Sequence, residues 1–179
     1  HEYWGGNNED EYTNLNTILA KSLDEIYVEL HCQFLFIPNC TYTKGHKLQD
    51  DRLTHQDVVS GMKNKHAAFE IKDQLSVHDT YRLFSLLDMH ISNRRHSCIF
   101  ASMNSIPFVT INGSFEGHLS PLLNELNIPE QLVHLDHKNN LTEKILETWK
   151  NKKIFVEKTK LIVEKLSEDS QKSISLLIG

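Results

Sequence analysis

The chain of 179 residues carries 19 basic and 24 acidic side chains, which gives a formal net charge of -5. This balance argues against a surface built to neutralise a nucleic-acid backbone, and no apolar run approaches the roughly 20 residues that a membrane-spanning helix needs. With 39% hydrophobic and 24% charged residues, the composition is that of a globular domain large enough to bury a core.

Cysteine and histidine residues are scattered rather than clustered. The three cysteines, Cys32, Cys40 and Cys98, lie at wide spacings that favour neither a disulfide framework nor a paired-cysteine zinc site. None of the eleven histidines forms the helical pair with an intervening carboxylate that a zinc protease requires. We therefore predict no structural metal and no cofactor, and a reducing cytoplasm as the simplest location.

Helix-like and strand-like patterns alternate along the chain. Apolar residues at helical spacing alternate with short apolar runs that end at proline or at polar residues. A Ser76–Asp79 capping box marks the start of the third helix. The predicted helices span residues 12–30, 53–64, 76–87, 97–103 and 119–126, the predicted strands span 33–37, 67–71, 89–92, 108–112 and 132–135, and a charge-rich helical segment spans 141–176.

This alternation predicts the fold class. Regular strand and helix alternation implies parallel strands joined by right-handed crossovers, so we expect one α/β domain over residues 1–179, with a parallel Rossmann-like sheet flanked by helices. A Rossmann-type half normally opens with its central strand, whereas this sequence opens with polar residues and a helix. We expect that strand to come from outside this sequence, with Trp4–Asn7 as the turn that follows it.

Asn93, Arg94, Arg95 and His96 lie where a buried strand gives way to a helix. Free backbone N–H groups and the positive end of the helix dipole favour an anion at such a point, and an arginine adds a bidentate fork. His96 is the side chain of this group that is suited to proton exchange near neutral pH. The alternative is a solvated arginine pair beside a capping or packing histidine, with Arg95 pointing to solvent.

Polar residues also follow the neighbouring strands. Asn112 and Ser114 stand at the end of the 108–112 strand, where they either bind a ligand or shape a turn. His46, Asp50 and Asp51 follow the first strand; they could orient the hydroxyls of a substrate or form an exposed acidic loop. Because ligands of doubly wound sheets bind outside the carboxyl ends of the strands, we expect these clusters to face one crevice.

The segments 88–96 and 106–109 carry a resemblance to a known family. Asp88 to His96, followed by a helix of small residues and by Ile106-Pro107-Phe108-Val109, resembles the polysaccharide pyruvyl transferase family, whose members carry an Arg-Leu-His signature after a strand. Arg94 and His96 match the outer positions of this signature, and Arg95 replaces its leucine. The tyrosine and lysine expected after the following strand are not obvious, since Asn112 and Phe115 stand near those places. By pattern the resemblance covers about residues 10 to 150.

The resemblance implies a glycosyltransferase-B-like enzyme of two Rossmann-like domains. This chain would supply the C-terminal half, and the N-terminal domain would be absent from it. The donor would be phosphoenolpyruvate, and the acceptor a glycan or lipid-linked sugar of a cell-surface polysaccharide, joined into a pyruvyl ketal in the cytoplasm or at the inner membrane. Arg94, Arg95, Asn93, Asn112 and Ser114 would bind substrate, and His96 would act as acid or base, or stabilise the leaving phosphate.

Two other functions stay open from the sequence. A sugar-nucleotide glycosyltransferase or epimerase of the same architecture would use the basic pair to hold a diphosphate, although a glycine-rich phosphate loop and an acidic residue for a ribose are missing. The chain could also be a non-catalytic module that binds glycan or serves assembly.

Overall fold

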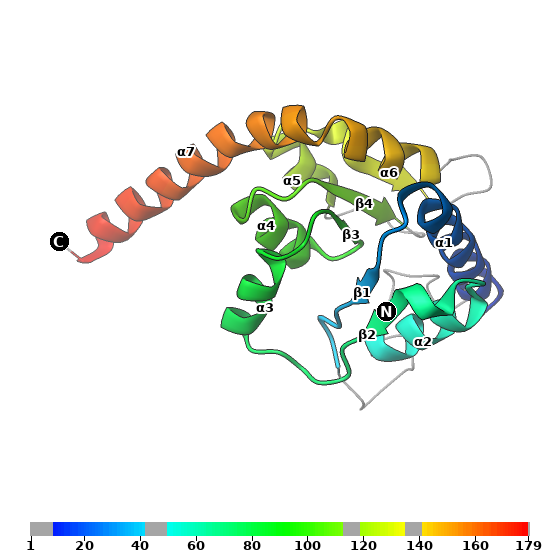
Figure 1. The fold of residues 1–179 in the computed structure, drawn as a ribbon. Coiled ribbons are helices and arrows are strands. Elements are labelled where there is room, and N and C mark those ends of the chain that lie inside the picture. The colour runs from blue at the N-terminus through cyan, green and yellow to red at the C-terminus, as the bar shows by residue number, and fades with distance from the viewer. Residues whose placement is uncertain (1–8, 42–49, 113–118, 135–140, 179) are drawn as a thin grey trace.

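The computed structural model describes residues 9–41, 50–112, 119–134 and 141–178, with side chains described as far as residue 169. It is an α/β fold in which helices surround short parallel strands, and a long C-terminal helix extends away from the body (Figure 1). The helices are α1 (Glu9–Leu30), α2 (Asp51–Gly61), α3 (Val77–Phe84), α4 (Arg95–Met103), α5 (Leu119–Glu125), α6 (Leu141–Lys150) and α7 (Lys152–Ile178), with two short 3-10 helices at Lys65–Ala67 and Pro129–Gln131. The strands are β1 (Phe34–Phe36), β2 (Ala68–Glu70), β3 (His90–Ser92), β4 (Phe108–Asn112) and β5 (Leu132–His134).

The strands form two separate parallel sheets. One has the order β1-β2, and the other has the order β3-β4-β5. The predicted fold class is confirmed, because all the strand pairs are parallel and helices flank both sheets. The expected single sheet is nevertheless divided, because β1-β2 and β3-β4-β5 are separate sheets.

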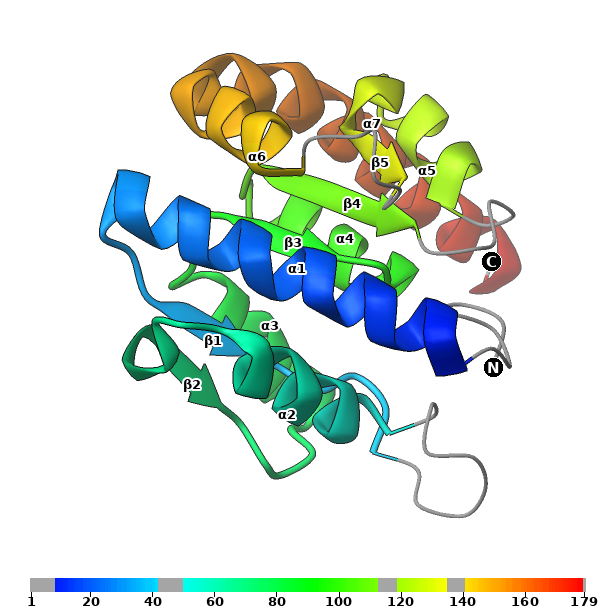
Figure 2. The same ribbon diagram turned by 90° about the vertical axis from the view of Figure 1, so that its right-hand side faces the viewer.

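Helix α1 connects the two sheets. In Figure 2 it lies across the interval between β1-β2 and β3-β4-β5. Leu15, Leu23 and Ile26 of α1 share one buried cluster with residues of α2, α6, β4 and β5, and Phe34 and Phe36 of β1 pack against it. The apolar stripe of a single amphipathic helix therefore covers both sheets at once.

The second core lies on the opposite face of the three-stranded sheet. There α4, α5 and α7 pack together, and the cluster includes Phe84, Cys98, Phe108, Leu123 and Phe155. The rings of Phe108 and Phe155 meet edge to face with centroids 5.4 Å apart, a favourable arrangement for aromatic pairs. This contact fixes the first turn of α7 against β4.

Side-chain caps decide where several helices begin. Asp50 accepts a hydrogen bond from the backbone N–H of Arg52, so α2 begins at Asp51 rather than at the predicted residue 53. Ser76 caps α3 by accepting from the N–H of Asp79, as the predicted capping box requires.

The ends of the predicted helices are less accurate. The predicted helix 53–64 ends at Gly61, where the buried carboxylate of Asp24 accepts from the N–H groups of Lys63 and Asn64 at 2.7 and 2.8 Å. The third predicted helix ends at Phe84 rather than at residue 87. The predicted segment 141–176 is two helices, α6 and α7, that meet at Asn151. Trp4–Asn7 lies outside the described residues.

Candidate functional site

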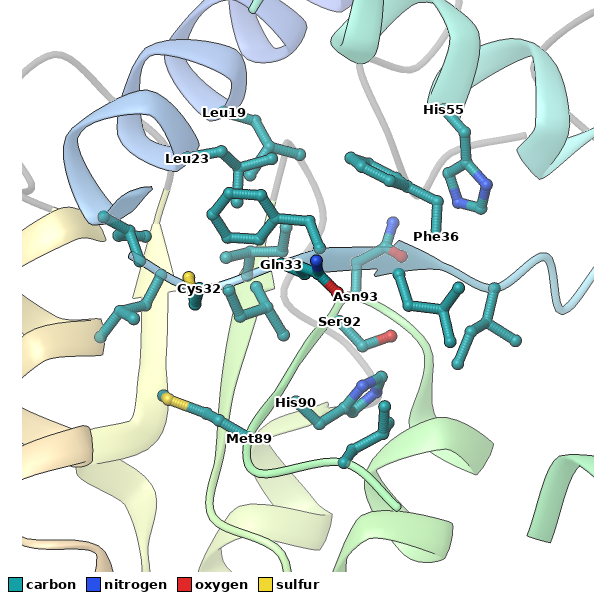
Figure 3. A pocket seen from close by; sticks show the side chains of 18 of the residues that line it. Leu19, Leu23, Cys32, Gln33, Phe36, His55, Met89, His90, Ser92 and Asn93 are labelled. Carbon is teal, nitrogen blue, oxygen red and sulfur yellow. The ribbon is translucent and has the colours of Figure 1, made fainter. Parts of the chain in front are cut away.

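A cavity of about 920 Å³ lies between β1 and β3. It runs from the start of these strands, at Cys32 and Met89, to the segments that follow them, at Asn39 and Arg94. Figure 3 shows Leu19 and Leu23 on one side of β1, and Met89 and His90 on the other. Apolar side chains line most of the length of this cavity; Asn39, Ser92, Asn93 and Arg94 lie at the carboxyl ends of the strands, and Gln33 and Asp88 at the other end.

The polar end of the cavity joins the two sheets through Arg94. The Ser92 hydroxyl accepts a hydrogen bond from the N–H of Arg94 at 2.9 Å, which turns the chain out of β3 into α4. The Arg94 side chain then reaches back to α2, where Nη2 donates to Asp51 Oδ1 at 2.5 Å. The other oxygen of Asp51 accepts from the N–H groups of Asn39 and Cys40, both at 2.9 Å. Asp51 therefore anchors the segment that follows β1 and orients the guanidinium at the same time.

Arg94 keeps hydrogen-bonding capacity beyond this ion pair. Its side chain is 28% exposed, and its Nε is buried with no partner among the described residues. Most buried polar atoms in proteins are paired, so an unpaired guanidinium N–H beside a cavity points to a bound anion or water. The crevice at the strand ends thus holds one arginine with an unpaired N–H, beside the carboxylate of Asp51.

The amino end of α4 is open. Arg94 is its N-cap residue and makes no side-chain capping hydrogen bond. The hydroxyl of Ser97, in the first turn, donates to Asn39 Oδ1 at 3.0 Å and so ties α4 to the loop after β1. Free N–H groups and the helix dipole favour negative charge at such an end.

Arg95 and His96 differ from Arg94 in their surroundings. Both belong to the first turn of α4 and both are exposed. Neither of them lines the cavity, whereas Asn93 and Arg94 do. The four residues of the motif are therefore divided: Asn93 and Arg94 lie in the cavity wall, while Arg95 and His96 stand on the exposed turn next to it. The placement of Arg95 matches the alternative in which it points to solvent.

The other predicted site residues that the structure describes, Asn112 and Asp50, do not line the cavity. The register pairs Ser92, the last residue of β3, with Thr110, so β4 continues two residues further, to Asn112, at the same edge of the sheet. Asn112 is buried, with 4% of its surface exposed, and does not line the cavity. Asp50 pairs with Arg52 at 2.6 Å and has a structural role as a helix cap. Ser114, His46 and Phe115 lie outside the described residues.

Two histidines in the cavity wall were missed by the sequence reasoning. His55 packs against the ring of Phe36, with centroids 5.2 Å apart, and its Nδ1 has no partner among the described residues. Burial lowers the pKa of His55; the carboxylates of Asp51 and Asp50 oppose this shift, and Arg94 adds to it. The spacing of four residues between Asp51 and His55 on one helix was the signal that could have placed them on the same face.

His90 is the second of these histidines. Its ring meets that of Phe84 at a centroid distance of 4.7 Å, and its Nε2 has no partner among the described residues. Burial lowers the pKa of His90 to about 3, because charging an imidazole away from water is costly. His90 therefore contributes a neutral imidazole to the cavity near neutral pH.

The described residues also bear on metals and membranes. Within them, no group of three or more His, Cys, Asp and Glu side chains is placed to hold a metal ion. None of the helices in the described ranges combines the length and the apolar character that crossing a bilayer requires.

Together, the fold and the site define a Rossmann-like α/β chain whose cavity carries the Arg94–Asp51 ion pair at the strand ends. A family model described as polysaccharide pyruvyl transferase matches residues 8–114, more than half of the chain. The chain belongs to this family, as the 88–96 and 106–109 segments suggested. Its family is one of transferases that act in polysaccharide pyruvylation. No curated protein and no solved structure matches the chain.

Proposed function

We propose that this chain takes part in the transfer of pyruvyl from phosphoenolpyruvate to two hydroxyl groups of a glycan sugar, forming a pyruvyl ketal and releasing inorganic phosphate. The family match carries this proposal, because it spans the strand β3, the Asn93–His96 motif and the first turn of α4. A donor that is a cytoplasmic metabolite would place the reaction in the cytoplasm, with the sugar acceptor either free or held at the inner membrane.

The donor carries a phosphate and a carboxylate on a three-carbon frame, so its site must neutralise two anions. We assign one anion to Arg94, whose Nε is unpaired while Asp51 holds Nη2. The uncapped first turn of α4 supports the other, with Arg95 as a mobile second cation. Asn93, Asn112 and Ser114 would complete the polar rim of the donor site.

The reaction also requires two proton movements. The two acceptor hydroxyl oxygens bond to the central carbon of the donor, and the bond from this carbon to the phosphate oxygen breaks. One hydroxyl proton ends on the methylene carbon, which becomes a methyl group, and the other leaves with phosphate. His96, on the exposed turn beside the cavity, is the group we assign to acid-base exchange or to stabilising the leaving phosphate.

Calorimetric titration of the chain with phosphoenolpyruvate and, separately, with a uridine diphosphate sugar tests the choice of donor. We expect binding of phosphoenolpyruvate alone, and Arg94→Ala should weaken it by at least about tenfold, because a charge-assisted hydrogen bond contributes about 1.5–3 kcal/mol. Arg82→Ala removes an exposed arginine of α3 and should leave binding unchanged. Binding of the nucleotide sugar alone would favour the glycosyltransferase or epimerase, and binding of neither would favour a non-catalytic module.

Replacing His96 tests its chemical role. His96→Ala should lower kcat by ~10² to 10⁴ while changing the affinity for phosphoenolpyruvate less than about threefold, because general acid-base help acts in the transition state. The measurement is phosphate release with phosphoenolpyruvate and an acceptor glycan.

The chain offers a matched control for this variant. His78 is the second residue of α3, as His96 is of α4, and both are exposed. His78→Ala should leave kcat unchanged. A His96→Ala enzyme with wild-type kcat would remove His96 from the reaction.

A further inference from the structure

The cavity has a second property that does not depend on the proposed function: it separates two sheet edges that face each other. Among the strands that the structure describes, β4 is paired on both sides, β3 is paired only to β4, and β1 is paired only to β2. All these pairs are parallel. The cavity between β1 and β3 is therefore bordered on two sides by strand edges with unused pairing capacity.

The hydrogen bonds identify which peptide groups face the cavity. Phe36 accepts from the N–H of Ile71 in β2's continuation, and His90 donates to the carbonyl of Pro107, next to β4. Along a parallel strand, successive residues direct their N–H and C=O groups to opposite sides. Leu35 of β1 and Ile91 of β3 consequently direct theirs toward the cavity. Both of these strands lie within the described residues, where no strand pairs with either edge.

The order of the strands agrees with this picture. A Rossmann sheet has the order 3-2-1-4-5-6, with its first strand at the centre. Counted from the first strand after α1, this chain gives the order β2-β1, a gap, and then β3-β4-β5. The gap is at the place of the central strand, and α1 covers it from one side, with Leu23 and Ile26 among the residues that line the cavity (Figures 2 and 3).

We propose that the cavity is a slot for one apolar β-strand, which lies parallel between β1 and β3 and joins them into a single sheet. The occupant is a strand from outside the described residues that is joined ahead of α1. In that arrangement α1 becomes the crossover between two neighbouring parallel strands, a connection that such strands require.

The lining indicates the chemistry of this strand. Phe34, Phe36, Ile91, Ile111 and Ile145 border the slot, and a central strand of an α/β sheet is buried on both faces and reads as a continuous run of Val, Ile and Leu. The carboxyl end of the strand would reach Arg94 and Asn93, at the polar end of the cavity. The inserted strand would thus complete the wall of the crevice as well as the sheet.

Amide exchange measured by NMR on the full chain tests whether the edges are open. The N–H groups of Leu35 and Ile91 should exchange much faster than those of Ile71 and His90, which donate to the carbonyls of Phe36 and Pro107. Equal protection of all four would mean that β1 and β3 already pair with a neighbour, and would overturn the proposal.

A second experiment supplies the strand as a peptide. The probe is an acetylated and amidated peptide with a central Val-Ile-Val-Val-Ile run between terminal lysines. At ten times its Kd it should slow exchange of the Leu35 and Ile91 N–H groups by about tenfold, because exchange then proceeds through the free fraction. The N–H of Glu70, on the outer edge of β2, should not change.

The control peptide has proline in place of the central valine, which removes a ladder donor and excludes the peptide from the middle of a sheet. It should bind at least tenfold more weakly. Equal binding of both peptides would mean that the cavity binds apolar peptides without backbone hydrogen bonds to β1 and β3. Binding of neither peptide would mean that the cavity does not accept a strand. Each of these results overturns the proposal, and neither depends on phosphoenolpyruvate binding.

Discussion

At the scale of single residues, Asp51 is the side chain that assembles the candidate site. It accepts from Arg94 on one oxygen and from two backbone N–H groups on the other. Only 15% of its side chain is exposed. Removing the carboxylate would therefore leave the Arg94 guanidinium and two backbone N–H groups without their acceptor at a largely buried position. An arginine held in this way presents its remaining N–H groups in a fixed direction, which lowers the entropy lost when an anion binds.

Asp51→Asn should lower the free energy of unfolding by about 1–3 kcal/mol, because the amide keeps the shape but loses the charge that pairs with Arg94. Urea denaturation provides the measurement. Asp57→Asn is the control: Asp57 is an exposed residue of the same helix that accepts from the Tyr12 hydroxyl, and its substitution should cost less than about 0.5 kcal/mol. Equal losses would show that Asp51 has no special structural role.

At the scale of secondary-structure elements, the junction between α1 and α2 depends on one buried carboxylate. Asp24 accepts from the N–H groups of Lys63 and Asn64 and from the Asn64 side chain. It thereby satisfies backbone donors just beyond the end of α2 and fixes that end against α1. Gly61 belongs to the same contact, since a β-carbon there would lie 3.3 Å from the β-carbon of Ala20.

Asp24→Ala should destabilise the chain by at least about 2 kcal/mol, since three donors lose their partner at a buried position. Thermal or urea unfolding of this variant can be compared with that of Glu29→Ala, which removes an exposed carboxylate from the same helix. We expect the Glu29 variant to stay within about 0.5 kcal/mol of the original chain. Similar stability of the two variants would contradict the role given to Asp24.

At the scale of the whole molecule, the two sheets differ in how completely helices cover them. Leu35 and Phe69 are partners in the register of β1 and β2, and they remain 38% and 49% exposed. The equivalent face of the three-stranded sheet is covered by α4, α5 and α7. The half of the molecule built on β1 and β2 is therefore the less completely packed half.

Acid should destabilise the molecule through His90. Its pKa is about 3 in the fold and 6.5 in the unfolded chain. Between these two pH values the unfolded state therefore binds a proton at His90 that the folded state does not bind. The contribution of neutral His90 to the free energy of unfolding is fully present well above pH 6.5. It is lost progressively as the pH falls from 6.5 toward 3, and the loss amounts to about 2 kcal/mol at pH 5. Unfolding free energies measured across this range should fall less steeply for His90→Gln, whereas the two profiles should run parallel above pH 7.5. Parallel profiles throughout would exclude His90 as the cause.

The sequence by itself determined the elements and their parallel arrangement. Apolar runs such as 108–112 and capping residues such as Ser76 act over a few neighbouring residues, so their effect can be read locally. The strand-end placement of Asn93 and Arg94 could also be read from the order of the patterns. The helix ends were less readable, because the end of α2 depends on Asp24, about 40 residues away in the chain.

Only the tertiary structure decided which of the polar residues act together. Arg94 and Asp51 are 43 residues apart, and nothing in the local pattern near either residue indicates that they pair. The same holds for the exposure of Arg95 and His96, and for the burial that makes His55 and His90 part of the cavity wall. A sequence pattern states which side chains a strand end carries, but the direction of each side chain and its solvation depend on elements packed from distant parts of the chain.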